Sequence, residues 1–305
     1  MSRNSGNCLL MRLAGEMDNS MIIYLLSCTL AAALLIVMIC KPRLATSLIP
    51  GHHFKVPYTT TETKPMRLLI FGGTGPSGIA LIRKSLEVYP ASTVLVYVRS
   101  PQKVPADLSQ NPSVIIIAGE LAELDKVEAA LVGRNANHNE INEDETNPVD
   151  VVLSALGPTG PFHSSGCPIA KFYEELIDLM AKHLVKRLLV LCTASYPDPH
   201  DKFSLTTYTI VNTVSTLAHS AYADFKEVGQ VVTQRGTEKG LLWTVVRVPI
   251  LTKQDSEDVV AGYVGDGTTG NVLARKGFAA FCIGEIEKKE WIGKAPMISN
   301  TNGFI

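Results

Sequence analysis

The sequence predicts an α/β protein built on a Rossmann-type, doubly wound parallel sheet, and three observations indicate this class. Short apolar runs alternate with helical patterns from residue 66 onward. The runs are rich in Val, Ile and Leu and lack polar alternation, which is typical of strands buried on both faces. A glycine cluster directly follows the first run. Alternation of this kind implies right-handed crossovers between parallel strands.

The expected elements follow one another in chain order. The predicted strands are 68–71, 93–98, 114–117, 151–153, 188–191 and 244–248. The predicted helices are 78–88, 124–131, 169–184 and a long helical stretch from about 204 to 234. The insertion 134–148 is rich in Asn and Glu and almost free of apolar residues, so it is interpreted as a solvated loop at the amino end of the sheet. An acidic loop that binds a partner is the alternative for this segment.

Composition excludes several classes of protein. Hydrophobic residues make up 46% of the 305 residues and charged residues 19%, which excludes wholesale disorder. The 28 Lys and Arg residues balance 29 Asp and Glu residues, so no bulk charge favours nucleic acid, and none is predicted as a partner. Six cysteines are too sparse for a disulfide scaffold, and they form no CxxC pair or Cys/His cluster. We therefore predict mostly reduced thiols and no metal site.

The N-terminal part of the chain differs from the body. Residues 1–20 form a tail, and the run 21–40 that follows contains no charged residue. At 1.5 Å per residue, a helix of this length spans about 30 Å, the thickness of the hydrocarbon core of a bilayer. A transmembrane helix is therefore predicted at 21–40. A cleaved signal peptide and a buried core helix are the alternatives, but the run is longer than the ~7–15 apolar residues of a signal and has no polar face.

Residues 41–65 are interrupted by prolines and are interpreted as a linker to the dinucleotide-binding domain at 66–305. Lys41 and Arg43 follow the apolar run, which favours a single-pass membrane protein whose body is cytosolic. Met66 directly precedes the first strand, so the alternative is that residues 1–65 are an optional extension.

The glycine cluster has the properties of a dinucleotide phosphate site. A diphosphate binds bare N–H groups at a helix N-terminus, where the helix dipole favours anions. Gly72, Gly75 and Gly78 have a G-x-x-G-x-x-G spacing that permits this close approach, and a tight turn without a ligand is the alternative. The residues predicted to bind the cofactor in this turn are Gly72, Gly73, Thr74, Gly75, Pro76, Ser77 and Gly78.

The end of the second strand favours NADP(H) over NAD(H). An acidic residue at this position would bind the ribose 2′-hydroxyl of NAD. The chain has Arg99 and Ser100 there, followed by Lys103, and no carboxylate. Arg99 can pair with a 2′-phosphate and Ser100 can hydrogen-bond it, whereas an ordinary surface Arg is the alternative.

Two further strand ends complete the predicted cofactor site. Glu120 follows the third strand, where a carboxylate would meet the amine of the adenine. Ala155, Leu156 and Gly157 follow the fourth strand, where mainly small residues let the backbone pass the ribose and the nicotinamide.

With these motifs in place, the body from about Met66 to Asn300 resembles the NmrA-like, NAD(P)-binding group of atypical short-chain dehydrogenases/reductases. The segments that carry the resemblance are 72–78, 98–100, 154–157 and 240–249. Two stretches, 193–204 and 262–267, are similar to a fungal branch that includes averufin-oxidase-like proteins of polyketide pathways. The resemblance implies a Rossmann fold and a bound NAD(P)(H). The chain departs from the family at Glu120, where members usually carry Asp.

A candidate catalytic pair lies in the long helical stretch. Reductases of this superfamily use a Tyr as proton donor near the nicotinamide, with a Lys one turn on that holds the ribose. Tyr222 and Lys226 have this i,i+4 spacing and therefore share a helix face. Ser195 follows the fifth strand, and either Ser195 or Thr193 is expected to hydrogen-bond a substrate carbonyl. The non-catalytic interpretation is a helix whose Tyr packs and whose Lys is solvated.

The substrate region is expected mainly in 158–168 and 248–305. His163 lies in the first segment and is interpreted as a surface loop residue without a role. These features together predict a membrane-anchored, NADP(H)-dependent oxidoreductase that transfers hydride to or from a small carbonyl or aromatic substrate. The alternatives are a non-catalytic dinucleotide sensor that regulates a partner, and a membrane-bound scaffold that keeps the cofactor for stability.

Overall fold

The structure, a computed structural model, describes residues 53–54, 64–133, 147–158, 163–301 and 303. Within these ranges no helix combines the length and the apolar character needed to cross a bilayer. The predicted transmembrane span 21–40 lies outside the described residues, as does most of the insertion 134–148.

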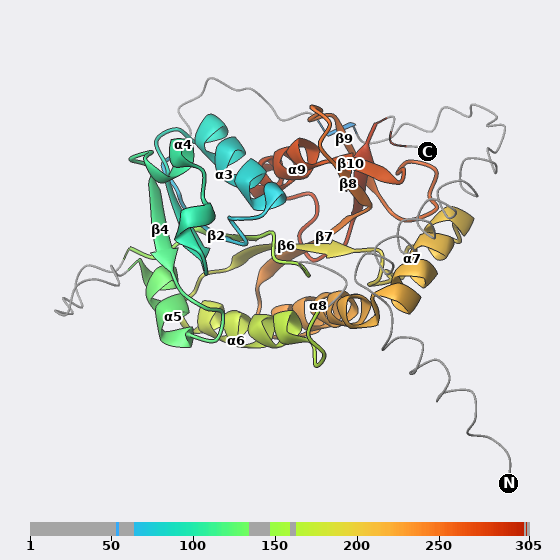
Figure 1. Cartoon of the computed structure of the whole chain (residues 1–305), viewed down its shortest axis with the longest axis horizontal. Coiled ribbons are helices and arrows are strands. Elements are labelled where there is room, and N and C mark those ends of the chain that lie inside the picture. The colour runs from blue at the N-terminus through green and yellow to red at the C-terminus, as the bar shows by residue number, and fades with distance from the viewer. Residues whose placement is uncertain (1–52, 55–63, 134–146, 159–162, 302, 304–305) are drawn as a thin grey trace, which may run out of the picture. The chain divides into compact units, whose positions relative to one another are not determined.

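The main sheet of the described chain has nine strands in the order β1-β9-β11-β7-β6-β5-β2-β3-β4 (Figure 1). Six consecutive strands of the chain pair in parallel at its centre, and Leu69 in the first of them pairs with Leu95 on one side and Val152 on the other. All six strands expected from the sequence are confirmed. They are β2 (Arg67–Phe71), β3 (Thr93–Val98), β4 (Val114–Ala118), β5 (Val151–Ser154), β6 (Arg187–Thr193) and β7 (Leu242–Val248).

The winding of the parallel strands reverses at β2. The chain passes from β2 to β3 and β4 on one side and then returns to β5, β6 and β7 on the other. Ligands of doubly wound sheets bind outside the carboxyl ends of the strands at this switch point. The gap between the ends of β2 and β5 is therefore the place where the fold offers a ligand site.

One edge of the sheet is antiparallel, which differs from the purely parallel sheet expected from the sequence. β11 (Met297–Asn300) is parallel to β7 but antiparallel to β9 (Val259–Gly262). β1 (His53–Phe54) is antiparallel to β9, so two residues inside the segment interpreted as a linker are part of the sheet. Antiparallel neighbours need no crossover helix between them.

Two helical layers cover the sheet (Figure 1). On one face lie α3 (Pro76–Val88), α4 (Ala106–Ser109) and α9 (Arg275–Lys288), and on the other lie α5 (Leu124–Val132), α6 (Pro168–Lys182) and α8 (His219–Glu238). In β2, Leu68 and Ile70 belong to the core beneath α3 and α9, whereas Leu69 and Phe71 belong to the core beneath α6 and α8. Successive strand side chains point to opposite faces, so two cores require an unbroken apolar strand.

The C-terminal region from residue 248 adds a second, smaller sheet. β8 (Ile250–Thr252) and β10 (Val272–Ala274) pair in parallel, and α9 follows β10 directly. Phe278 and Phe281 of α9 are fully buried in the core that also contains Leu81 and Ile82 of α3. The last helix of the described chain is thus packed along the first long one.

The long helical stretch expected at 204–234 contains two helices. Ser204 caps the first, α7 (Leu205–Leu217), by accepting a hydrogen bond from the Thr207 N–H to its hydroxyl at 3.3 Å. The chain then leaves helical geometry at Ala218, where φ is −136° and ψ is 53°, and α8 begins at His219. Periodicity alone did not reveal this break, because no Gly or Pro marks it.

Candidate cofactor and active site

The glycine turn between β2 and α3 requires glycine at two positions. Gly72 has a positive φ of 76°, and a Cβ at this position would lie 2.8 Å from the carbonyl carbon of Ala155. A Cβ on Gly78 would lie 2.2 Å from the carbonyl oxygen of Gly72, so only glycine lets α3 approach the turn this closely. The turn is also closed by a hydrogen bond of 3.1 Å from the Gly75 N–H to the same oxygen.

The N-terminus of α3 is bare. Gly75 occupies the N-cap position without a side chain that could cap the helix, and Pro76 begins the first turn. The N–H groups of Ser77 and Gly78 have no intrahelical acceptor, as expected for the first turn of a helix. These donors and the positive end of the helix dipole favour an anion at the switch point between β2 and β5.

Gly75 offers a test of this anion site that leaves the fold intact. A Cβ at Gly75 would meet only the Gly72 carbonyl oxygen, at 3.5 Å, and its φ of −80° and ψ of 158° suit any residue. We therefore expect Gly75→Ala to leave the thermal midpoint nearly unchanged. It should raise the Kd for NADPH about tenfold, or about 1.4 kcal/mol, because the methyl group occupies space needed by the phosphates.

Titration calorimetry and thermal melting check this prediction together. Gly78→Ala serves as the contrast, because its Cβ overlaps backbone and should lower the free energy of unfolding by about 1–3 kcal/mol. Equal NADPH affinity of Gly75→Ala and the unchanged chain would contradict a phosphate site in this turn.

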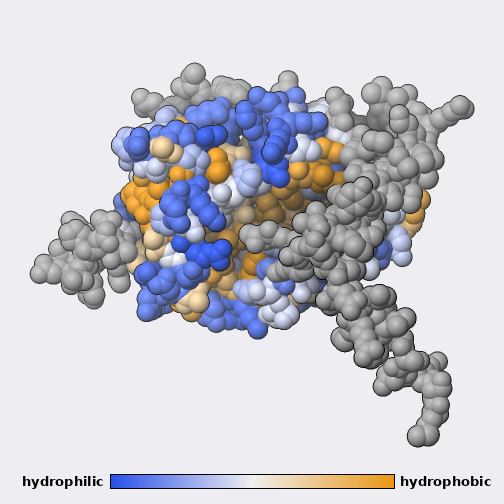
Figure 2. Space-filling model, in the orientation of Figure 1, coloured by the Kyte–Doolittle hydropathy of each residue, from blue (hydrophilic) through white to orange (hydrophobic). Residues whose placement is uncertain are grey.

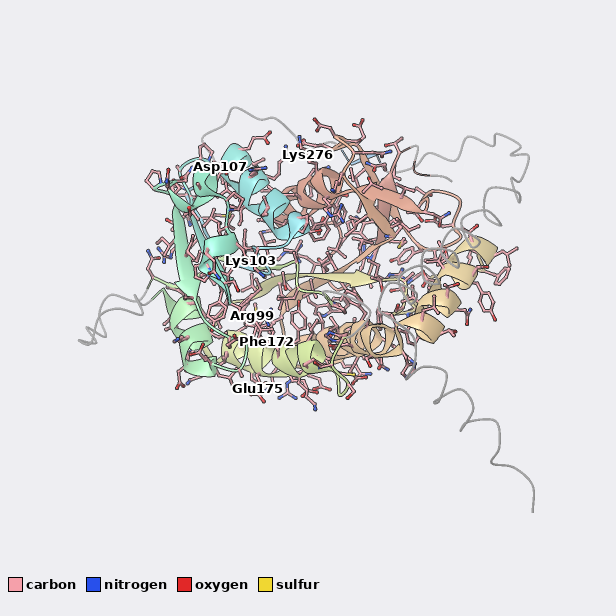
Figure 3. The ribbon with its side chains drawn as sticks, viewed as in Figure 1. Arg99, Lys103, Asp107, Phe172, Glu175 and Lys276 are labelled. Atoms are coloured by element: carbon pink, nitrogen blue, oxygen red, sulfur yellow. The ribbon has the colours of Figure 1, made fainter. Side chains whose placement is uncertain are left out.

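The residues after β3 present positive charge to solvent. Arg99 is exposed, and it makes no ion pair or hydrogen bond with the described part of the chain. Ser100 precedes the short 3₁₀ helix Pro101–Lys103, in which the Lys103 N–H donates to the Ser100 carbonyl oxygen. Figure 3 shows Arg99 and Lys103 toward the β3–β4 side of the molecule. The structure thus leaves both cations available to an anionic ligand.

The turn that carries Glu120 is held by a buried tyrosine. The Tyr97 hydroxyl donates to the Glu120 carbonyl oxygen at 2.8 Å, and the Glu120 N–H donates to the Glu123 carboxylate at 2.7 Å. Burial, and then the nearby carboxylate of Glu123, raises the pKa of Tyr97 to about 12, so its hydroxyl stays a donor. A Cβ at Gly119 would lie 2.2 Å from this hydroxyl, and the Glu120 side chain remains exposed.

The segment after β5 lies directly against the glycine turn. The Ala155 N–H donates to the Phe71 carbonyl oxygen at 3.0 Å, which continues the pairing of β5 with β2. The Ser154 hydroxyl accepts a 2.6 Å hydrogen bond from Tyr173 of α6, so it is committed to the core. A Cβ at Gly157 would lie 3.1 Å from the ring of Phe225 in α8. The predicted cofactor residues of β2 and β5 are therefore neighbours in space.

One face of α8 is turned toward this site. Tyr222, Lys226 and Gly229 are spaced i, i+4 and i+7 and share that face. A Cβ at Gly229 would lie 2.1 Å from the ring of Tyr196, the residue that follows Ser195 after β6. Tyr222 is half-buried and Lys226 is exposed, whereas Ser195 is buried. Gly229 of α8 thus packs against the residue that follows Ser195, seven residues along the helix from Tyr222.

The three candidate catalytic side chains are not hydrogen-bonded to one another within the described residues. The Ser195 N–H donates to the Thr193 hydroxyl at 3.2 Å, which orders the loop after β6. Next to it, the Cys192 thiol donates to the Phe225 carbonyl oxygen at 3.2 Å, and burial raises its pKa to about 12, so this thiol is unreactive. In the described chain, Cys167, Cys192 and Cys282 are free thiols, and no group of three or more metal-ligating side chains occurs.

Asp224, which lies between Tyr222 and Lys226, is a structural residue that sequence reasoning missed. Its fully buried carboxylate accepts hydrogen bonds from the Ile169 and Ala170 N–H groups at 3.1 and 2.9 Å and so caps α6 from another helix. His163 Nε2 lies 2.6 Å from the same carboxylate, and the His163 side chain is only 12% exposed. The interpretation of His163 as a surface loop residue is therefore wrong.

We expect Asp224→Asn to lower the free energy of unfolding by about 0.5–2 kcal/mol, because the amide nitrogen that replaces one carboxylate oxygen cannot accept a hydrogen bond. Chemical denaturation measures this change. Asp125→Asn, in the exposed first turn of α5, is the matched control and should stay within about 0.5 kcal/mol of the unchanged chain. Equal stability of Asp224→Asn and the control would show that the cap contributes nothing.

A largely buried ion pair joins strand β7 to the loops that follow β6 and β9. Arg247 in β7 is fully buried and forms a bidentate pair with Asp201, with N–O distances of 2.6 and 2.8 Å. Asp201 also accepts hydrogen bonds from the N–H groups of Asp198 and Val264 at 2.8 and 3.0 Å. A charged residue inside an apolar strand is the sequence signal that could have predicted this partner.

Comparison with known proteins agrees with this geometry. Residues 72–289, more than two thirds of the chain, match the model of a protein family described as NAD(P)H-binding. No functionally curated protein sequence matches the chain.

Several solved structures share the fold. A short-chain dehydrogenase/reductase from Veillonella parvula, solved in complex with NADP, has a TM-score of 0.60 at 13% sequence identity, over 79% of this chain and 97% of that one. A Rossmann-fold NAD(P)-binding family protein from Shigella flexneri has a TM-score of 0.55 at 18% identity, over 79% and 96% of the two chains. A putative NAD-dependent epimerase/dehydratase from Bacillus halodurans has a TM-score of 0.53 at 17% identity, over 77% and 94%.

Proposed function

Because the chain belongs to the NAD(P)H-binding protein family, we propose that it is an NADP(H)-dependent oxidoreductase of the short-chain dehydrogenase/reductase type. The observation that carries the proposal is the bare N-terminus of α3 at the switch point of the sheet, pressed against the segment after β5. Backbone donors, a helix dipole and glycines that admit close approach together suit a diphosphate.

Different residues of the chain would bind different parts of the dinucleotide. The turn Gly72–Gly78 would hold the diphosphate, and Glu120 would meet the adenine. Ala155, Leu156 and Gly157 would line the path of the second ribose. Arg99, with Ser100, would bind a 2′-phosphate, because Arg99 is exposed, has no ion pair among the described residues, and is followed by no carboxylate at this strand end.

The chemistry that we propose is hydride transfer between the nicotinamide and a carbonyl carbon, which the cofactor supplies when bound. Tyr222 would donate the proton to the carbonyl oxygen, or take it up in the reverse direction. Lys226 would stabilise the tyrosinate by its charge and hold the ribose. Ser195 would orient the carbonyl oxygen by a hydrogen bond. Apolar surface between the two helical layers in Figure 2 fits a small carbonyl or aromatic substrate, including the polyketide type that the sequence resemblance suggests.

A non-catalytic dinucleotide sensor is the second candidate. It is favoured by the lack of hydrogen bonds among Tyr222, Lys226 and Ser195 in the described chain. Calorimetry with NADPH followed by a panel of aromatic and aliphatic carbonyls separates the two proposals. Binding with turnover supports the enzyme, whereas tight binding without oxidation of NADPH by any carbonyl supports the sensor. If neither NADPH nor NADH gives a heat of binding, both the enzyme proposal and the sensor proposal are contradicted.

Arg99→Ala tests the choice between the two cofactors. Loss of a charge-assisted hydrogen bond costs about 1.5–3 kcal/mol, so we expect the Kd for NADPH to rise roughly 10- to 100-fold while the Kd for NADH stays unchanged. Arg83→Ala is the matched control, because this Arg forms an exposed pair with Asp107 on the outer face of α3 and α4. An equal loss of affinity for both nucleotides would count against a preference for NADP(H).

We also propose that residues 21–40 anchor the protein in a membrane, with the dinucleotide-binding domain on the cytosolic side. The support is the uncharged run itself and the Lys and Arg residues that follow it. Extraction of membranes with alkaline carbonate tests the anchor: an integral protein stays in the pellet, and release into the supernatant would contradict the proposal.

A further inference from the structure

Helix α7 (Leu205–Leu217) has no buried residue and is rich in exposed apolar side chains. Phe203, just before it, is 77% exposed, Leu205 is 61% exposed and Tyr208 is 59% exposed. Val214 and Leu217 are exposed as well, so five large apolar side chains lie open within fifteen residues. Concentration of this kind marks a surface that meets another apolar phase.

The same helix carries no charge. No Asp, Glu, Lys, Arg or His occurs between Phe203 and Ala218. Ordinary exposed helices have a charged or strongly polar outer face, which keeps them in water. The lack of charge on α7 is therefore unexpected for a face that water covers.

Many of the polar side chains of α7 form hydrogen bonds inside the helix. Five of them donate to backbone carbonyl oxygens three or four residues earlier, at 2.8 to 2.9 Å; they are Thr209, Asn212, Thr213, Ser215 and Thr216. This back-bonding removes the need for water around the side chains. Polar groups that enter a lipid environment must be satisfied in this internal way.

The N-terminal chain joins the domain on the side where α7 begins. In the antiparallel pair of β1 with β9, His53 faces Val260 and Phe54 faces Val259, so the chain comes to β1 from the Gly262 end of β9. At that end, the Lys202 N–H donates to the Val264 carbonyl oxygen at 2.7 Å, and α7 starts three residues later. Twelve residues separate the apolar run 21–40 from β1, a reach of about 40 Å at most.

We propose that α7, with Phe203, docks on the surface of a lipid bilayer and lays its apolar side chains into the interface. The proposal goes beyond the cofactor chemistry and rests on the membrane anchor proposed at 21–40. Lipid is favoured over a second copy of the chain because only twelve residues separate the proposed anchor at 21–40 from β1. Since α7 has no cationic side chain, docking depends on apolar burial and requires no anionic lipid.

The test uses the full chain with Tyr208→Trp, reconstituted into phosphatidylcholine vesicles with or without bromine on the acyl chains. Bromine quenches tryptophan emission only at close range. Wild type, which has Trp243 and Trp291, supplies the background. We expect most of the emission added by the substitution to be lost in brominated vesicles, in low and in high salt alike.

Ile115→Trp is the matched control, because Ile115 is an exposed apolar residue on β4, at the sheet edge opposite to β1. Its added emission should survive in brominated vesicles. A further chain with Tyr208→Trp, Leu205→Glu and Leu217→Glu should still float with the vesicles and should regain its emission, because two charges keep α7 out of the lipid.

Three results would overturn the proposal. A chain that floats but shows no quenching at position 208 keeps its anchor and has α7 away from lipid. Emission at 208 that is insensitive to bromine but blue-shifts with protein concentration assigns α7 to contact between two copies. If the chain does not float with the vesicles, both the membrane anchor and the docking of α7 are contradicted. NADPH binding, measured on the same samples, shows independently whether the proposed oxidoreductase function stands.

Discussion

Replacement of Tyr222 by Phe is expected to lower kcat about 10²- to 10⁴-fold, the usual contribution of a positioned proton donor. Phenylalanine keeps the ring and the packing at the N-terminal end of α8 and removes only the hydroxyl. The Kd for NADPH should therefore stay within twofold of the unchanged protein. Steady-state kinetics with a carbonyl that the chain reduces, and calorimetry with NADPH, measure the two quantities separately.

Tyr208→Phe is the matched control for this experiment. Tyr208 is exposed on α7 and is not among the proposed cofactor-binding or catalytic residues, so loss of its hydroxyl should leave kcat unchanged. If Tyr222→Phe retains full activity, the proton comes from another group, and the assignment of Tyr222 is wrong. A Lys226→Met variant then shows whether α8 takes any part in catalysis.

The largest loss of stability is expected for Arg247→Met. Removal of one partner of a buried ion pair leaves the other charge without compensation, which costs about 3–5 kcal/mol. Asp201 would lose both guanidinium hydrogen bonds and would keep only the backbone donors of Asp198 and Val264. Denaturation in urea should show the loss as a lower midpoint at unchanged slope.

Arg235→Met provides the control, because the Arg235–Asp178 pair has similar chemistry but is more than a third exposed on both sides. Exposed pairs contribute about 0–1 kcal/mol, so this variant should be nearly as stable as wild type. Equal losses in free energy of unfolding for the two variants would show that burial does not increase the contribution of the Arg247–Asp201 pair to stability.

The loss in free energy of unfolding caused by Arg247→Met should also depend on pH. Burial acts to raise the pKa of Asp201, but hydrogen bonds from Arg247 and the backbone outweigh it and hold the pKa below its ordinary value. A lowered pKa in the folded state means that the pair stabilises the protein above the ordinary carboxyl pKa of about 4 and loses this effect as the pH falls through the lowered value. The difference between variant and wild type should therefore be largest at neutral pH and shrink in acid.

The core of the fold was predictable because buried parallel strands and a glycine turn leave local signals. The six central strands and the helices that follow them coincide with the apolar runs, since each strand needs apolar residues on both faces. The strands β1, β8, β9, β10 and β11 escaped prediction because they are short, and β1 also pairs with β9 at the other end of the domain sequence. The break at Ala218 escaped because no Gly or Pro marks it in the sequence.

The sequence carries information about the candidate site where backbone geometry determines the residue type. Gly72 and Gly78 have no room for a Cβ, so the glycine spacing alone carries the information. The partners of Asp224 and Arg247 are 46 to 61 residues away along the chain, and a single sequence does not show such pairings. For the same reason His163 could not be distinguished from a surface residue until the fold placed it beside Asp224.

The packing of α9 along α3 has a consequence for synthesis of the protein. The part of α3 that packs on α9 stays uncovered until α9 has emerged from the ribosome. A chain that ends after β7 would contain every residue predicted to contact the dinucleotide. It would lack α9, which packs on α3 and completes that core. Such truncated products are expected to be cleared by proteases or to aggregate, so nonsense mutations as late as residue 270 should behave as complete losses.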